Sequence, residues 1–79
     1  MLTPKSLEVF LLYAEDANNW DGSPWVSMGN ITVTKEMRGN LSDLVQKGLI
    51  KIHSYDPDQY MTFTESGRAL ALEHGIEIR

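Results

Sequence analysis

The fold is decided by the stretch Leu44-Val45-Gln46-Lys47-Gly48-Leu49-Ile50, within which a helix ends and a strand begins. Gly48 predicts a left-handed residue just after the helix, because glycine adopts a positive φ without steric cost. Leu49 and Ile50 then supply the apolar contact that follows such a cap. We therefore predict a helix that runs to Lys47 and a strand that begins at Ile50.

The segments on either side of this stretch have opposite periodicities. The helix begins at Thr34, a good N-cap, and its helical spacing predicts one buried stripe, made of Met37, Leu41, Leu44 and Val45. After Gly48 the period changes to two, with an inward set made of Ile50, Ile52, Met61 and Phe63. The turn sequence Asp56-Pro57-Asp58 lies between the two runs, so we predict an antiparallel hairpin.

Two further helices are predicted near the ends of the chain. The first begins at Thr3-Pro4, buries a stripe made of Leu7, Phe10, Leu11 and Ala14, and leaves Asp16 outside that stripe. The last begins at Thr64, ends at Gly75 and buries Ala69, Leu70 and Leu72. Residues 20–33 hold two glycines and a proline without a sustained period. They predict a turn at residues 21–24 and a short helical turn or strand near Trp25–Met28.

Two strings in this order resemble one known family. The stretch at residues 44–50 resembles the Leu-x-x-Lys-Gly-Leu-Ile signature that ends the recognition helix of winged helix-turn-helix proteins. The second string, Phe63-Thr64-Glu65-Ser66-Gly67-Arg68-Ala69-Leu70, resembles the Leu-Thr-x-x-Gly that closes the wing in MarR-like regulators. Together the strings cover about residues 41–70.

The resemblance implies one α+β domain over residues 1–79, in the order helix, irregular loop, helix, β-hairpin wing, helix. A regular member has a full helix packed across the recognition helix. Residues 20–33 have room for little more than one helical turn, so we expect this second helix to be shortened or missing.

The function implied by the resemblance is that of a small DNA-binding protein, such as a transcriptional regulator, that reads duplex DNA with the helix at residues 35–47. Lysine and arginine suit phosphates or guanine, glutamine suits adenine, and glycine lets a backbone come close. The expected DNA contacts are Lys35, Arg38, Gly39, Ser42, Gln46, Lys47, Lys51 and His53. A solvated helix face has the same composition and is the alternative explanation of these residues.

The distribution of charge makes such binding weak and sensitive to salt. The net charge is −4, although residues 35–51 hold four basic and two acidic side chains. Acidic flanks and an acidic wing tip suit a second function, a protein–protein interaction module that does not bind DNA. The residues expected to contact such a partner are Trp20, Trp25, Tyr55, Asp56 and Asp58. For the tryptophans, packing of the loop against the first helix is the simpler explanation.

Composition and motifs argue against an enzyme, a cofactor and a metal site. The chain has no cysteine, and its two histidines, His53 and His74, lie on different elements without a partner at ligand spacing. No nucleotide-binding, serine-hydrolase or zinc-protease motif occurs.

The apolar runs are too short for a membrane span and the start lacks a signal peptide, so we expect a cytoplasmic protein. By composition alone, a compact acidic chain of this kind resembles phage-encoded accessory proteins. The tail at residues 76–79 alternates like a strand. It can pair between the subunits of a homodimer or fold back onto its own core in a monomer, and we expect the latter.

Overall fold

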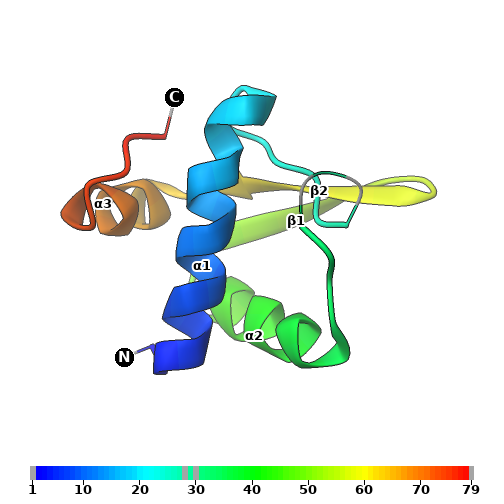
Figure 1. Ribbon diagram of the computed structural model, residues 1–79, viewed down its shortest axis with the longest axis horizontal. Coiled ribbons are helices and arrows are strands. Elements are labelled where there is room, and N and C mark those ends of the chain that lie inside the picture. The colour runs from blue at the N-terminus through cyan, green and yellow to red at the C-terminus, as the bar shows by residue number, and fades with distance from the viewer. Residues whose placement is uncertain (1, 28, 30, 79) are drawn as a thin grey trace.

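The computed structural model describes residues 2–27, 29 and 31–78, and the elements run in the predicted order (Figure 1). They are α1 (Pro4–Ala17), the 3-10 helix η1 (Asn18–Trp20), α2 (Lys35–Gln46), β1 (Ile50–Tyr55), β2 (Asp58–Phe63) and α3 (Glu65–Glu73). This confirms the α+β class. The described residues between η1 and α2 form no α-helix, so the expected second helix has no counterpart among them. The short helical turn or strand expected near residues 25–28 ends at Met28, which lies outside the described residues.

Each α-helix begins at the threonine that the sequence predicts. The hydroxyl oxygen of Thr3 accepts from the Ser6 N–H at 3.1 Å, and that of Thr34 accepts from the Met37 N–H at 3.1 Å. These bonds satisfy backbone donors that the first helical turn leaves unpaired. Gly48 has a φ of +71°, which confirms the left-handed cap after α2.

The two strings that carry the family resemblance contact each other directly. The Thr64 hydroxyl lies 2.6 Å from the Gly48 carbonyl oxygen, and the Thr64 N–H donates to the Leu49 carbonyl at 3.1 Å. Thr64 also caps α3 by accepting from the Gly67 N–H at 3.0 Å. A Cβ atom at residue 67 would overlap the Leu49 carbonyl oxygen. Glycine is therefore what allows α3 to pack against the end of α2.

The hairpin has two different faces, and a loop segment near Trp25 bonds to one edge of it. Ile50 pairs with Phe63 and Ile52 with Met61, so the inward set predicted from the sequence faces the helices. Residues 24–26 run beside β2, where the Val26 N–H donates to the Gln59 carbonyl at 2.9 Å. An isolated bridge there pairs Trp25 with Tyr60. Figure 1 shows α1 running across the hairpin and the β1–β2 turn reaching out past the helices.

The core lies between α1, α2 and the inner face of the hairpin. Phe10 and Tyr13 of α1 are fully buried, and the Phe10 and Phe63 rings meet edge to face at 5.7 Å. On the first helix, Leu7 and Leu11 are only half-buried. Tyr13 is buried in their place because α1 crosses the sheet at an angle that the helical spacing alone does not specify.

The burial predictions for four residues are wrong. Asp16 is only 6% exposed, because Asn19 Nδ2 and Trp20 Nε1 donate to its carboxylate oxygens at 3.1 and 3.2 Å. Val45 is 40% exposed, since it faces an open hollow beside the hairpin. On α3 the buried residues are Gly67 and Ala71, whereas Leu72 is 62% exposed and Ala69 is exposed. The close approach at Gly67 sets which side of α3 faces inward.

The described part of the tail folds back onto its own chain. Ile78 is buried, and its carbonyl accepts from the Arg68 guanidinium at 2.9 Å. Asn18 Nδ2 donates to the Glu77 carbonyl at 2.9 Å. This is the intramolecular arrangement that we expect for the tail. In the part of the chain that the structure describes, no helix has the length and apolar character needed to cross a membrane.

The buried side chain of Tyr13 makes the stability of the fold decrease at alkaline pH. Its hydroxyl donates to the Val26 carbonyl at 2.6 Å, and burial raises the pKa of Tyr13 from 10.0 to about 12. The neutral phenol is thus favoured in the folded state. The free energy that it contributes is fully present below pH 10 and is lost as the pH rises from 10 to about 12.

We therefore expect the unfolding free energy, measured by urea denaturation, to fall across this alkaline range. Tyr13→Phe should remove the fall, at a cost of about 1 kcal/mol at neutral pH for the lost hydrogen bond. Tyr55→Phe is the matched control, because Tyr55 is 67% exposed and should leave the alkaline profile as it is. If the unfolding free energy of Tyr13→Phe falls with alkaline pH as much as that of the parent, Tyr13 is not the group responsible for the fall.

Candidate functional site

The outward side of α2 is held in place by contacts on its inward side. Leu41 and Leu44 are buried in the core. The buried Ser6 hydroxyl of α1 lies 2.9 Å from Asp43 Oδ2 and 3.2 Å from Asn40 Oδ1. The other side of α2 faces solvent, and it carries the exposed residues Lys35, Arg38, Gly39, Ser42 and Gln46. The structure therefore brings five of the expected DNA contacts together on one helix side.

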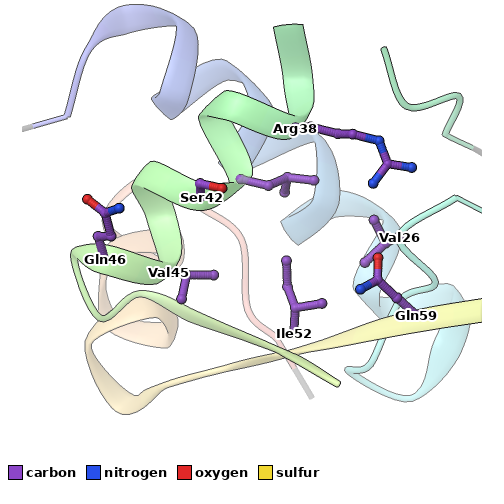
Figure 2. Close-up of a pocket in the computed structure, with 8 residues that line it drawn as sticks. Val26, Arg38, Ser42, Val45, Gln46, Ile52 and Gln59 are labelled. Atoms are coloured by element: carbon purple, nitrogen blue, oxygen red, sulfur yellow. The ribbon is translucent and has the colours of Figure 1, made fainter. Parts of the chain in front are cut away.

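A hollow of about 340 Å³ lies between α2 and the hairpin (Figure 2). Its apolar lining is Val26, Leu41, Val45 and Ile52, and its polar lining is Arg38, Ser42, Gln46 and Gln59. Figure 2 shows Arg38 and Gln59 at one side of the hollow and Gln46 at the far end of α2. Hydrogen-bonding groups beside small apolar groups suit base edges, including the methyl group of thymine. Sequence reasoning missed Val26 and Gln59, which belong to segments distant from α2.

The cations of α2 are not equally available. Lys47 Nζ donates to Asp43 Oδ1 at 2.6 Å, and this contact, with the Ser6 hydroxyl, holds the pKa of Asp43 below its usual range. Lys47 is thus partly neutralised by its own helix. Neither Lys35 nor Arg38 forms an ion pair with a described residue. These two side chains are the cations that the outward side of α2 offers to a phosphate.

Lys51 and His53 lie apart from this side of α2. Ile52 lines the hollow, and neighbouring residues of a strand point to opposite faces. Lys51 and His53 therefore belong to the outer face of the hairpin, away from α2. His53 is also engaged there, with Nε2 2.9 Å from Thr62 Oγ1 and its ring stacked 4.9 Å from that of Tyr60.

The residues expected to contact a protein partner gather at the outer face and tip of the hairpin. A second hollow, of about 460 Å³, is lined by Trp20, Ser23, Trp25, Tyr55 and Tyr60, and we call it the aromatic hollow. Asp56 is exposed at the tip and Asp58 is half-buried. Tyr60 also lines the aromatic hollow but was not among the residues expected from the sequence. Its position opposite His53 in the predicted hairpin could have indicated that it lies on the same face.

The two tryptophans have different packing roles. Trp20 donates to Asp16 of α1, and its ring lies 3.3 Å from where a Cβ of Gly29 would be, so it clamps the loop onto α1 as expected. Trp25 instead packs on the hairpin, edge to face with Tyr55 at 6.2 Å and with Tyr60 at 6.4 Å.

Neither metal-binding residues nor comparison with known proteins adds to the candidate site. Among the described residues, no three of the His, Asp and Glu side chains lie close enough to hold a metal ion. A function proposed for this chain therefore rests on its own residues, because comparison with family models, curated proteins and solved structures gives no match.

Proposed function

We propose that this protein binds duplex DNA with the outward side of α2, and that the β1–β2 hairpin acts as the wing of a winged-helix-like domain. One observation carries the proposal. Arg38, Ser42 and Gln46 line the hollow beside the hairpin, while Lys35 and Gly39 lie exposed on the same side of the helix. A role in transcription regulation is the expected use of such binding.

The dimensions and side chains of α2 suit the major groove. The helix has 12 residues, and an α-helix with its side chains is narrow enough to enter the major groove. In this pose Lys35 and Arg38 contact phosphates, which position the protein, and Ser42 and Gln46 meet base edges, which carry the sequence information. Apart from its chain neighbours and the backbone of α2 itself, no described residue has an atom within 4 Å of where a Cβ of Gly39 would be, so the DNA can approach the backbone there.

The contact surface is small, and this limits affinity. The described residues between η1 and α2 form no helix that could rest on the DNA backbone. The hairpin tip carries Asp56 and Asp58, which repel phosphates. Two phosphate contacts predict a slope of only about −2 when the logarithm of the binding constant is plotted against that of the salt concentration. We therefore expect binding that is measurable at low salt and lost near physiological salt.

Replacing Arg38 with alanine should reduce the magnitude of this slope by about one, because one phosphate contact is lost. The measurement is a fluorescence anisotropy titration of a mixed-sequence duplex over a range of salt concentrations. Lys5→Ala is the matched control, since it removes the same charge from an α1 side chain whose ammonium lies 3.8 Å from Glu36. Ser42→Ala and Gln46→Ala should change the preferred sequence more than the slope.

Two results would refute this proposal. The first is a parent protein that shows no duplex binding at ~50 mM salt, where even a few phosphate contacts are detectable. The second is a Lys5→Ala variant that changes the slope as much as Arg38→Ala does. In either case the outward side of α2 is a solvated helix face.

A further inference from the structure

The aromatic hollow is a second surface, on the side of the hairpin that faces away from α2. Its four rings come from four separate segments: Trp20 from η1, Trp25 from the loop that bridges to β2, Tyr55 from β1 and Tyr60 from β2. Tyr55 is 67% exposed, although it is one of the largest apolar side chains in the domain. The core does not require a ring at that position, so its exposure calls for another explanation.

The rings are held in position before any ligand arrives. Trp25 packs edge to face with both tyrosines, and His53 stacks beneath Tyr60 at 4.9 Å with an interplanar angle of 19°. The backbone around Trp25 is fixed to β2, since the Met61 N–H donates to the Pro24 carbonyl at 2.9 Å. Binding to such a surface costs little conformational entropy, because few side chains need to be ordered.

The charges near the rings are negative. Asp21 directly follows Trp20, and Asp56 directly follows Tyr55, and both carboxylates are exposed. No lysine or arginine in the described part of the chain lines the aromatic hollow. Lys51 is on the same face of β1 as Tyr55, but four residues away, or ~13 Å along the strand. These charges disfavour a polyanion at the rings and favour a ligand that carries a positive charge.

We propose that the aromatic hollow binds a proline-rich peptide segment of a partner protein, with an arginine or lysine at one end of the segment. Prolines stack on exposed tryptophan and tyrosine rings, and the polyproline II helix is already formed before binding. That helix leaves its carbonyl oxygens unpaired. The hydroxyls of Tyr55 and Tyr60 donate to no described residue, so they are available to these carbonyls. Asp56 at the hairpin tip then faces the basic end of the peptide.

Intrinsic fluorescence of the full chain gives a direct test, because both of its tryptophans line the aromatic hollow. The probe is an acetylated peptide with a run of about six prolines followed by two arginines. Two control peptides keep the length: one replaces the prolines with glycine and serine, and the other replaces the arginines with glutamates. We expect a dissociation constant of about 100 µM for the probe, and binding at least about tenfold weaker for each control.

Variants of the protein separate the rings from the charges. Tyr55→Ala should weaken binding of the probe about tenfold, as expected for an aromatic anchor. Leu72→Ala is its matched control, because Leu72 is a similarly exposed apolar residue on α3 and should leave binding unchanged. Asp56→Asn combined with Asp58→Asn should weaken binding of the arginine peptide about threefold, and should not weaken binding of the glutamate peptide.

Three results would overturn the proposal: no change in tryptophan emission up to ~1 mM probe, equal binding of the glycine–serine peptide, or tighter binding of an oligothymidine that Tyr55→Ala weakens. The last result would assign the rings to stacking on single-stranded nucleic acid. The aromatic hollow and α2 are on opposite faces of the hairpin. Tyr55→Ala should thus leave duplex affinity unchanged, and the DNA proposal and the peptide proposal can fail separately.

Discussion

Gly67→Ala is expected to destabilise the folded domain by about 3 kcal/mol, near the upper end of the usual cost of overpacking. The added methyl group would overlap the Leu49 carbonyl oxygen, a backbone atom that cannot rotate away as a side chain can. Relief of the overlap requires α3 to move away from the end of α2. That movement would also strain the contacts of Thr64 with Gly48 and Leu49.

The matched control is Gly39→Ala, which makes the same substitution within α2. A Cβ at that position would meet no described residue outside the backbone of α2 within 4 Å, so we expect a gain of about 0.5–1 kcal/mol from the higher helix propensity of alanine. Thermal denaturation followed by circular dichroism distinguishes the two, since each kcal/mol shifts the midpoint by about 4–8 °C in a domain of this size. If Gly67→Ala unfolds at the same temperature as the parent, α3 does not pack against Leu49.

Leu44→Ala should cost about 2–5 kcal/mol, because it removes a large side chain from a site that cannot collapse fully. Leu44 is 1% exposed and lies in the core cluster with residues of α1 and the hairpin. A domain of 79 residues has a total stability of only about 4–12 kcal/mol, so the loss is a large part of the whole.

Leu72→Ala, which removes the same atoms from a residue that is 62% exposed, should change stability by no more than about 0.5 kcal/mol. Urea denaturation of both variants gives the comparison. Equal losses in the two variants would contradict the assigned inward side of α3. A midpoint for Leu44→Ala equal to that of the parent would contradict the assigned inward side of α2.

The boundaries of the elements were predictable from the sequence because they depend on local interactions. A threonine cap acts on an N–H three residues ahead, as Thr34 does on Met37, and a glycine such as Gly48 ends a helix through its own φ. The hairpin was equally predictable, since alternation and a turn sequence specify its register. These signals operate over a few residues and need no knowledge of the rest of the fold.

The candidate site was predictable only in part. The residues of α2 share one exposed side because helical spacing requires it, and the structure retains that grouping. The alternation in the hairpin predicted Lys51 and His53 on the outward side of the first strand, but their separation from the outward side of α2 was not predicted. It depends on which face of β1 packs against the helices. Sequence distance alone made the two groups look like one basic surface.

Tertiary structure alone decided the features that join distant segments. The sequence by itself determined the order of elements, the caps and the alternation in the hairpin, because each arises within a short stretch of chain. It did not determine that Gly67 would seat α3 against Leu49, that Asp16 would be buried beneath Trp20, or that Trp25 would meet Tyr55 and Tyr60. The physical reason is that a helix or strand presents several sides to its surroundings, and packing against other elements selects the side that is buried.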